Sequence, residues 1–306
     1  MLKPKLGLVG AGRWGSTVAE RIYREGVAEI AVVYDKDSNK SKSLATRIGA
    51  TAIDDLDGFE KQRDLLGIIV ATSIESLAEV SMRIIELGFN VLIEKPVADS
   101  LEKVRGLRRA AERKGIIAMP GFIVRFDPVS MWMKKYIESM EDGIEDLYLF
   151  RFSRRPPQNR LSNILLDLAI HDIDLARHLL LEDLELVSWY IHNLDIDQAV
   201  SIYAKHRRGY IYIGVDGISR QKVRKAIAVS TQSYIEGDYI NQYVILKTGG
   251  WNAHKYIEVK GSEALLNEIR AFIERCRGRD IEIPTLLDAE KAHEIISLIM
   301  NTRQRS

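Results

Sequence analysis

The chain has 306 residues, a length that indicates two domains at roughly 100–200 residues each. Hydrophobic residues make up 46% of it and charged residues 28%, so a disordered chain is excluded because there is ample apolar material for packed cores. Lys and Arg together number 44 against 43 Asp and Glu, a net charge of +1, which lacks the excess of positive charge that drives nucleic-acid binding. We therefore expect no nucleic-acid partner.

The N-terminal residues lead directly into an apolar strand pattern, without the apolar core of a signal peptide, and no run of about 18 apolar residues could span a bilayer. The single cysteine, Cys276, cannot form an intramolecular disulfide. We expect a cytoplasmic protein that makes no membrane contact.

Residues 1–120 alternate short apolar runs with helical stretches, a rhythm typical of parallel βαβ units with helices on both faces of the sheet. The predicted strands are residues 6–9, 30–34, 65–71, 90–93 and 116–118. The predicted helices are a stretch ending near residue 25 and residues 76–87 and 100–114. This part of the chain is predicted to be a doubly wound α/β domain.

The rhythm changes over residues 121–306. The predicted helices are 128–140, 163–180, 263–277 and 288–302, and the predicted strands are 147–152, 186–191, 200–206, 210–215, 226–234, 239–247 and 256–259. Two compact turn sequences, Arg207-Arg208-Gly209 and Glu236-Gly237-Asp238, indicate antiparallel hairpins. We expect a second domain with its own sheet.

A glycine-rich loop, Gly10-x-Gly12-x-x-Gly15, lies between the first strand and the first helix, and Asp35 ends the next strand 20 residues later. In this layout the glycines permit a tight turn, a close approach of a pyrophosphate and close helix–strand packing, while the helix N-terminus offers N–H donors to the anion. Asp35 would bind a ribose 2′-hydroxyl and repel a 2′-phosphate, which favours NAD, although Lys36 leaves NADP open. A connecting loop without a ligand is the alternative.

Glu94-Lys95-Pro96 stands at the C-terminal end of a predicted parallel strand, the end at which open α/β sheets bind ligands. Proline stops the strand and holds Lys95 at a corner, where its ammonium could bind a substrate hydroxyl or carbonyl. A lysine in a surface loop is the alternative.

The predicted helix 163–180 is apolar over most of its circumference and carries one polar stripe within an arc of roughly 80°. The stripe consists of Asn163, Asp167, His171, Asp174 and His178. Because unpaired buried polar groups cost about 1–3 kcal/mol each, the stripe needs partners, which could be protein groups, water or a ligand. We expect no metal, since no further His or Cys cluster completes a coordination shell.

Taken together, these motifs resemble those of the Gfo/Idh/MocA oxidoreductases in order and spacing, over essentially the whole chain. They are Gly10-Ala11-Gly12-Arg13-Trp14-Gly15, Asp35, Ala71-Thr72-Ser73, Glu94-Lys95-Pro96, Gly121-Phe122, Arg125-Phe126-x-Pro128 and Asp167-x-x-x-His171-x-x-Asp174. The resemblance implies an N-terminal Rossmann domain over residues 1–120, and a C-terminal α/β domain with an open, mostly antiparallel sheet over 121–306. Helix 288–302 would pack back on the first domain. It also implies NAD(P)-dependent hydride transfer to or from a sugar or cyclitol, in a homodimer or homotetramer built through the open sheet.

The resemblance also implies roles for individual residues. Lys95, His171 and Asp167 match the catalytic lysine, the general base or acid and the substrate-contacting aspartate. The implied cofactor-binding residues are Gly10, Gly12, Arg13, Trp14, Gly15, Asp35, Ala71, Thr72, Ser73, Glu94 and Lys95. The implied substrate-binding residues are Arg125, Asn163, Asp167, His171 and Arg160. The Lys95–Pro96 bond is expected to be cis, as is common in the family.

Residues 165–174 most resemble the branch that includes UDP-N-acetylglucosamine 3-dehydrogenases, which makes the C3 hydroxyl of such a UDP-sugar one candidate reacting group. Arg154, Arg155 and Arg160 could bind its diphosphate, with a solvated surface as the alternative. Ser73, Leu77 and Ala169 depart from the family pattern and weaken the inference of a substrate by analogy. A dehydrogenase of a free sugar or cyclitol and a non-catalytic dinucleotide-binding sensor both remain open.

Overall fold

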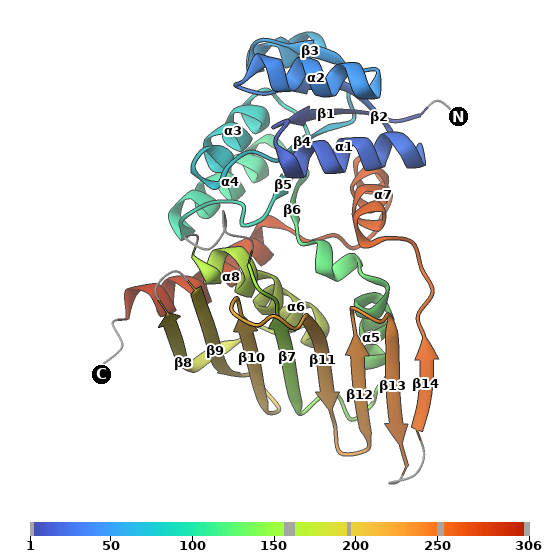
Figure 1. Ribbon diagram of the computed structural model, residues 1–306, viewed down its shortest axis with the longest axis vertical. Coiled ribbons are helices and arrows are strands. Elements are labelled where there is room, and N and C mark those ends of the chain that lie inside the picture. Colours follow the sequence, from blue (N-terminus) through green and yellow to red (C-terminus); the bar gives the residue numbers. More distant parts are fainter. Residues whose placement is uncertain (1–2, 156–162, 195–196, 250–253, 303–306) are drawn as a thin grey trace. The chain divides into compact units, whose positions relative to one another are not determined.

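The computed structural model describes residues 3–155, 163–194, 197–249 and 254–302, and the chain divides into two compact units (Figure 1). The first unit comprises residues 1–122 and 265–290, and the second comprises 123–264 and 291–306. Within the described ranges, none of the helices has both the length and the apolar character needed to cross a bilayer.

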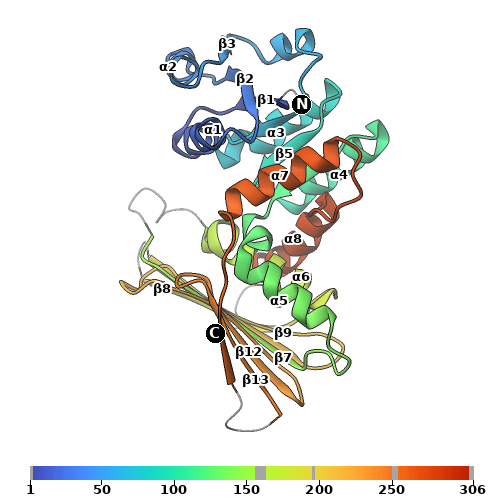
Figure 2. The same ribbon diagram turned by 90° about the vertical axis from the view of Figure 1, so that its right-hand side faces the viewer.

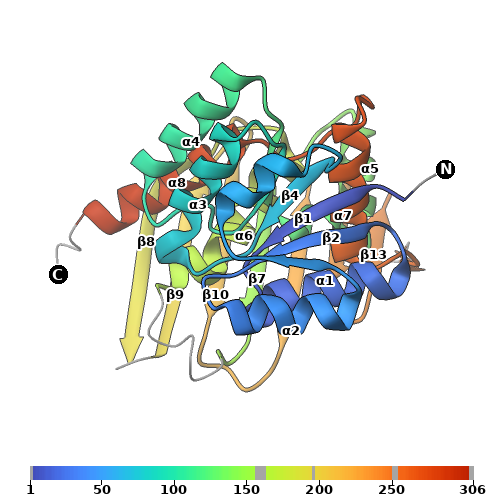
Figure 3. The same ribbon diagram turned by 90° about the horizontal axis from the view of Figure 1, so that it is seen from above.

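The first unit is built on an all-parallel sheet with the strand order β3-β2-β1-β4-β5-β6. Its strands are β1 (Lys5–Val9), β2 (Glu29–Tyr34), β3 (Thr51–Ile53), β4 (Gly67–Val70), β5 (Val91–Glu94) and β6 (Ala118–Gly121). Its helices include α1 (Arg13–Glu25), α2 (Ser38–Ile48), α3 (Ile74–Glu86) and α4 (Leu101–Lys114). Figure 3 shows α1 and α2 on one face of the sheet and α3 and α4 on the other. Because both faces are covered, β4 and β5 are buried throughout, which explains their continuous apolar sequences.

The predicted doubly wound α/β fold is confirmed, with two differences in detail. Helix α2 and strand β3 were not predicted, although α2 carries recognisable end signals: the Asp37 carboxylate accepts the Asn39 N–H, and Gly49 is left-handed. Strand β6 begins at Ala118, where the prediction ended, and includes Pro120. A proline is tolerated there because β6 is an edge strand of the sheet.

The second unit contains an eight-stranded sheet with the order β14-β13-β12-β11-β7-β10-β9-β8, in which only β7 and β10 pair in parallel. Its strands are β7 (Asp146–Phe152), β8 (Glu185–Leu194), β9 (Asp197–Lys205), β10 (Tyr210–Asp216), β11 (Val223–Val229), β12 (Ser233–Asp238), β13 (Tyr243–Thr248) and β14 (His254–Glu258). Helices α5 (Pro128–Glu138) and α6 (Ile170–Leu180) lie on one face of the sheet (Figure 2). The other face carries no helix of the described part of this unit, which confirms the predicted open, mostly antiparallel sheet.

One predicted hairpin turn is confirmed and the other is wrong. Residues 207–209 connect β9 and β10 as expected. The predicted strand 226–234 instead bends after β11, where the Ser230 hydroxyl accepts the N–H groups of Gln232 and Ser233. Gly237, predicted as a turn residue, lies inside β12. A Cβ at Gly237 would lie 2.6 Å from both Val129 Cγ1 and Met133 Sδ of α5, so this glycine permits close helix–sheet packing instead.

The predicted helix 163–180 is interrupted. Leu165–Ala169 forms a π-helical turn, and regular α-helix begins only at Ile170. Asn163 precedes this turn and holds its first three residues, because its side-chain oxygen accepts the Leu165 N–H at 2.8 Å and its backbone carbonyl accepts the Asp167 N–H at 2.9 Å. The single α-helical stripe predicted from a 100° rotation per residue therefore holds for His171, Asp174 and His178 but not across the turn that contains Asp167.

Helix α7 (Ala264–Cys276) packs against the sheet of the first unit, where a Cβ at Gly67 would lie 2.7 Å from the Phe272 ring. One turn earlier, Glu268 is only 1% exposed, and neither carboxyl oxygen has a hydrogen-bond partner in the part of the chain that the structure describes. Burial raises the pKa of Glu268 well above its usual range, and the neighbouring charge of Glu94 adds to the rise. Burial and the neighbouring charge therefore favour the protonated form of Glu268.

Helix α8 (Leu286–Asn301) begins two residues before the predicted helix 288–302. Its first turns belong to the first unit, where the Glu290 carboxylate accepts hydrogen bonds from Arg105 Nε at 2.9 Å and Arg108 Nε at 2.6 Å, both on α4. These paired guanidinium groups hold the pKa of Glu290 below its usual range, although burial opposes the shift. The start of α8 is thus fixed to α4.

The protonation of Glu268 can be tested with Glu268→Gln, which keeps the size of the side chain and removes its titration. The pKa of Glu268 is higher in the folded protein than in the unfolded protein. At a pH above the pKa of the unfolded state, unfolding therefore releases a proton. Native stability then falls by up to about 1.4 kcal/mol per pH unit above about pH 4.3, until the folded-state pKa is passed. We expect urea unfolding to show E268Q more stable than wild type near pH 8, with a flatter pH dependence.

Glu60→Gln, at an exposed glutamate of the same unit, should retain the wild-type pH dependence. An E268Q protein that is less stable than wild type near pH 8 would contradict the assignment, because it would mean that the fold needs a charged carboxylate at this position.

Candidate active site

The glycine loop after β1 has the geometry that its sequence predicts. Gly10 adopts a φ of +99°, and a Cβ there would lie 2.5 Å from the Ala71 carbonyl oxygen. A Cβ at Gly15 would lie 1.9 Å from the Gly10 carbonyl oxygen, so the start of α1 can meet the loop only without a side chain. A Cβ at Gly12, in contrast, would have no atom within 4 Å. The second glycine therefore faces space that a pyrophosphate could enter.

The N-terminus of α1 is suited to bind an anion. Gly12 is the N-cap residue, and no side chain caps the first turn of the helix. Helix N-termini attract anions because their first N–H groups have no partner within the helix and the helix dipole is positive there. Arg13 and Trp14, the first two helical residues, are exposed.

Asp35, which follows β2, holds the glycine loop directly. One of its carboxylate oxygens accepts the Ala11 N–H at 2.7 Å, and the other accepts the Asp37 N–H at 2.9 Å. Each carboxylate oxygen can accept more than one hydrogen bond, so these contacts leave capacity for a ribose hydroxyl. The next residue, Lys36, is exposed.

Two further predicted cofactor-binding segments lie beside the loop in the first unit. Residues Ala71, Thr72 and Ser73 follow β4, and the Ala71 carbonyl is the group that packs against Gly10. Ser73 is the N-cap residue of α3 without a side-chain capping bond, and Leu77, which replaces the histidine common in the family, is buried in the core. This replacement fits an apolar packing role.

Glu94 and Lys95 lie at the C-terminal end of β5, and the Lys95–Pro96 peptide bond is cis, as expected. Glu94 is 9% exposed and accepts a side-chain hydrogen bond from Trp14. Burial raises the pKa of Glu94, while Trp14 and the charge of Lys95 oppose the rise. Lys95 itself is partly buried. The predicted cofactor-binding residues are thus connected through contacts in the first unit.

The predicted substrate-binding residues that the structure describes lie in the second unit. His171 is 8% exposed and stands in the first turn of α6, one turn after Asp167. The Asp167 carboxylate lies 3.8 Å from Arg155, a buried residue that follows β7. The π-helical turn that carries Asp167 is a type of irregularity often found at functional sites.

The aspartates of this helical segment are matched by arginines. Asp174 accepts two bonds from Arg125, at 2.8 and 2.5 Å, and Asp172 accepts two from Arg151, at 2.6 and 3.0 Å. Side chains of both pairs are at most 6% exposed. For Asp174, the partner that the polar stripe requires is therefore a protein group, and Asp172, which lies off the stripe, is paired in the same way. Arg125, predicted to bind substrate, is therefore engaged with Asp174.

The three arginines predicted as candidate diphosphate ligands have different positions. Arg154 is exposed, whereas Arg155 is buried and also hydrogen-bonds Gln198 at 3.4 Å. Arg160 lies outside the described residues. Asn163, as described above, organises the π-helical turn, and its amide also lies 3.6 Å from the Met300 sulfur. Among the residues with described positions, no three His, Cys, Asp or Glu side chains are gathered to hold a metal ion.

Arg151 and Glu268 are buried charged residues that the sequence analysis did not identify. The sequence does contain a signal for both of them. Arg151 occupies the same face of β7 as the buried Leu147 and Leu149, so a charged residue interrupts an apolar alternation. Glu268 lies on the apolar face of α7, four residues before Phe272. A charged residue on a buried face indicates a paired or neutralised group.

Comparison with known proteins agrees with this geometry. Residues 5–122 match the sequence model of the oxidoreductase family with the NAD-binding Rossmann fold, Gfo/Idh/MocA. Scyllo-inositol 2-dehydrogenase (NAD⁺) of Bacillus subtilis is 24% identical over 308 residues, covering 93% of this chain and 90% of that protein. Inositol 2-dehydrogenase of Rhizobium meliloti is 28% identical over 184 residues, covering 58% of this chain and 56% of its own length.

UDP-N-acetylglucosamine 3-dehydrogenase of Acidithiobacillus ferrooxidans is 26% identical over 177 residues, covering 58% of this chain and 54% of that protein. Its solved structure superposes with a TM-score of 0.86 at 17% identity, over 98% of this chain and 97% of that one, which shows a common fold. The sequence matches to the Rhizobium and Acidithiobacillus proteins thus span about half of their lengths. Residues 5–122 thus match the model of the Gfo/Idh/MocA oxidoreductase family, which describes an NAD-binding Rossmann fold.

Proposed function

We propose that this protein is an NAD-dependent dehydrogenase that transfers a hydride between a hydroxyl-bearing carbon of a sugar or cyclitol and nicotinamide. The observation that carries the proposal is the first unit's glycine loop. A side chain at Gly12 would occupy open space, and Lys95 stands at the C-terminal edge of the same sheet. Open α/β sheets bind their ligands at that edge. The sequence relatives named as inositol and UDP-N-acetylglucosamine dehydrogenases support the same reaction class.

The residues of the loop fit a dinucleotide. The N–H groups at the start of α1 would hold the pyrophosphate, and Asp35 would accept a hydrogen bond from the adenosine ribose. Bound NAD would supply the hydride acceptor. Because a carboxylate repels a 2′-phosphate, we propose NAD as the preferred cofactor over NADP.

The proton chemistry is assigned to Lys95 and to residues of the second unit. His171 would take the proton of the reacting hydroxyl, and Lys95 would stabilise the negative charge that develops on that oxygen. Asp167 would orient the substrate or the imidazole. Arg155, at 3.8 Å, holds the Asp167 carboxylate in a region of positive charge. His171 is buried, so this step would take place with little water.

The substrate is proposed to be a polyhydroxylated ring. A cyclitol is favoured by the relative that aligns over nearly the whole chain, the scyllo-inositol dehydrogenase. UDP-N-acetylglucosamine, reacting at its C3 hydroxyl, is favoured by residues 165–174 and by the Acidithiobacillus relative. Because Arg155 is engaged with Asp167, a diphosphate would depend on Arg154 and on residues outside the described ranges. A dinucleotide-binding sensor without activity would not need Lys95, Asp167 and His171, because it transfers no proton.

The cofactor assignment predicts the effect of Asp35→Asn. This change removes the negative charge that repels a 2′-phosphate while keeping the shape of the side chain. We expect the ratio of the NADP and NAD dissociation constants to fall by about tenfold or more, since 1.4 kcal/mol corresponds to a factor of ten. Titration calorimetry with both cofactors measures the ratio.

Asp54→Asn, an exposed neighbour on the same unit, should leave that ratio unchanged. Wild-type protein that binds NADP more tightly than NAD would overturn the cofactor assignment.

The proton-transfer assignment predicts that His171→Ala lowers turnover by about 10²–10⁴-fold, the usual contribution of a general base. NAD affinity and melting temperature should stay close to those of wild type. The assay follows nicotinamide absorbance with a panel of inositols, free sugars and UDP-N-acetylglucosamine, which also separates the substrate classes.

His192→Ala, at an exposed histidine of β8, should keep full turnover. Full turnover in the His171 variant would remove this residue from the role. If no member of the panel reduced NAD in wild-type protein that binds NAD, the sensor function would be favoured instead.

We also propose that the chain forms a homodimer or homotetramer through the open face of the second unit's sheet. Side chains that alternate away from the helices form an aromatic cluster on this face. Ring-centroid distances are 4.9 Å for Tyr203–Tyr212, 5.8 Å for Tyr212–Phe150 and 5.9 Å for Phe150–Phe152. Tyr203 is 49% exposed. Exposed aromatic patches on soluble proteins often mark contact surfaces, and an identical copy is the partner we propose.

Placing a charge in this patch should weaken the assembly. Tyr203→Glu is expected to shift the mass measured by light scattering during size-exclusion chromatography toward that of one chain. Tyr23→Glu, at an exposed tyrosine of α1, should leave the mass unchanged. A wild-type protein that is monomeric at micromolar concentration would refute the proposal.

A further inference from the structure

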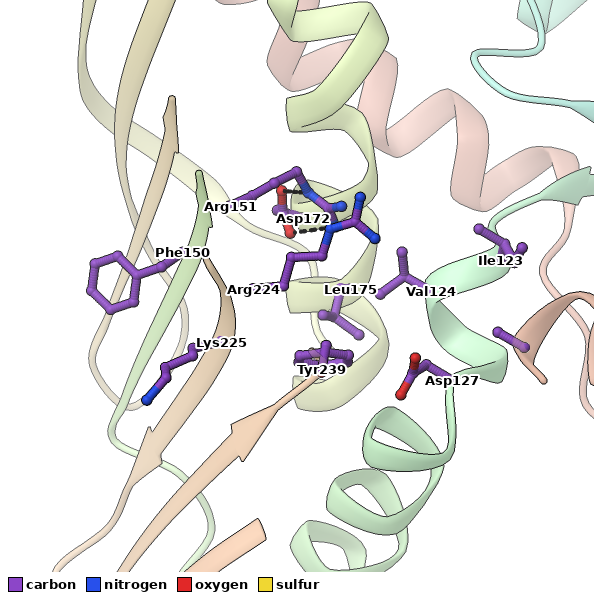
Figure 4. A pocket seen from close by; sticks show the side chains of 11 residues that line it. Ile123, Val124, Asp127, Phe150, Arg151, Asp172, Leu175, Arg224, Lys225 and Tyr239 are labelled. Atoms are coloured by element: carbon purple, nitrogen blue, oxygen red, sulfur yellow. Dashed lines mark hydrogen bonds and ion pairs between the residues drawn. The ribbon is translucent and has the colours of Figure 1, made fainter. Parts of the chain in front are cut away.

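Two arginines stand directly opposite each other on neighbouring strands of the second unit. In the antiparallel pairing of β7 and β11, Arg151 is the register partner of Arg224. Both side chains point to the face covered by helices, whereas Phe150 and Lys225 point to the other face (Figure 4). Like charges directly opposite in a sheet are destabilising, and a guanidinium does not lose its proton in proteins. This arrangement requires compensating negative charge.

Only one of the two arginines receives that compensation from the described residues. Asp172 makes both of its hydrogen bonds to Arg151, at 2.6 and 3.0 Å. Arg224 has no carboxylate within 4 Å in the described part of the chain, and its buried Nε has no hydrogen-bond partner there. Burial and the neighbouring charge of Arg151 lower the pKa of Arg224, while Asp172 and Asp127 act on it only from a distance and in the opposite direction.

A cavity of about 120 Å³ opens beside Arg224, far more than the roughly 10–15 Å³ that a single water needs on the same measure. Its walls include the apolar side chains of Ile123, Val124 and Leu175. Figure 4 shows Asp127 and Tyr239 on its walls as well.

These two polar neighbours already have partners. The Asp127 carboxylate accepts the Val129 N–H at 2.9 Å and the Gln242 amide at 3.3 Å, and the Tyr239 hydroxyl accepts a hydrogen bond from Ser130 at 3.1 Å. Burial raises the pKa of Asp127, while its bonds from Val129 and Gln242 and the charge of Arg224 oppose the rise; no ion pair within 4 Å joins Asp127 to Arg224 in the described part of the chain. The Tyr239 hydroxyl can still donate its own O–H, and the Arg224 guanidinium is the charged group beside it whose buried Nε has no partner among the described residues.

We propose that this cavity is a binding site for a small oxyanion, held by paired hydrogen bonds from the Arg224 guanidinium with Arg151 adding positive charge. Guanidinium groups suit ligands that present two oxygens side by side, as carboxylates, phosphate and sulfate do. The volume lies well below the roughly 300 Å³ at which sites for drug-sized molecules begin, so a nucleotide is too large.

The site is distinct from the proposed dehydrogenase site. Its lining residues all belong to the second unit, and none of Arg125, Asn163, Asp167 or His171 is among them. Asp172 forms part of the wall and is the residue that follows His171, so an occupied cavity would stabilise the helix that carries the proposed base.

The test compares wild type, Arg224→Met and the control Arg220→Met, at an exposed arginine before β11. Melting temperatures are measured in Tris chloride, with sodium sulfate, phosphate or acetate added and the ionic strength held constant with sodium chloride. Wild type and R220M should gain about 3 °C at ten times the dissociation constant, and R224M should gain nothing. A response to sulfate and phosphate but not acetate would identify a tetrahedral ligand, and the reverse a carboxylate.

Arg224→Met should itself fold well. In oxyanion-free buffer we expect it to be at least as stable as wild type, because the change relieves the like-charge pair. A crystal of wild type soaked in selenate should give an anomalous selenium peak inside the cavity.

The proposal fails if wild type and R224M respond equally, or if no oxyanion raises the melting temperature of wild type. It also fails if R224M is clearly less stable without oxyanion, since Arg224 would then have a partner within the protein. Selenium found only outside the cavity would count against it in the same way.

Discussion

The second unit is organised around the need to neutralise carboxylates on a buried helix. Three aspartate side chains project from residues 163–180, and each of them is paired with an arginine from outside this segment. The pairs are Asp167–Arg155, Asp172–Arg151 and Asp174–Arg125. A buried carboxylate that loses its partner costs on the order of 3–5 kcal/mol, so these pairs fix the helix against β7 and against the turn at Ile123–Phe126. His171 is positioned because its neighbours on the helix are anchored.

The same constraint engages a residue that the sequence predicts to bind substrate. Arg125 is predicted from the sequence to bind substrate, yet two hydrogen bonds join it to Asp174. Asp167 differs, because its carboxylate lies 3.8 Å from Arg155 and its side chain retains 16% exposure. Of the three aspartates, it has the most exposed side chain. The π-helical turn displaces it from the regular stripe and supports that distinction.

The glycine loop could be predicted in detail because its requirements are local. A positive φ at Gly10 and the close approach of Gly15 to the Gly10 carbonyl follow from a strand–turn–helix connection within six residues. The parallel sheet and the Lys95–Pro96 corner could be predicted for similar reasons. The pairing of Arg151 with Asp172 could not, because it depends on how helix α6 packs against strand β7, and the two residues are 21 positions apart in the sequence. Gly237 misled the prediction since a glycine required by helix packing has the same sequence signature as a turn.

Isotope transfer tests most directly whether the chain moves a hydride between a ring carbon and nicotinamide, as proposed. Wild-type protein would be incubated with NAD⁺ and ring-carbon-deuterated inositols, free sugars or UDP-N-acetylglucosamine, and the reduced cofactor analysed by mass spectrometry. We predict NADH that carries one deuterium from at least one of these substrates, and none with His171→Ala at matched protein concentration over the same short time. Protein that binds NAD⁺ yet yields no deuterated NADH from any of them would contradict the account.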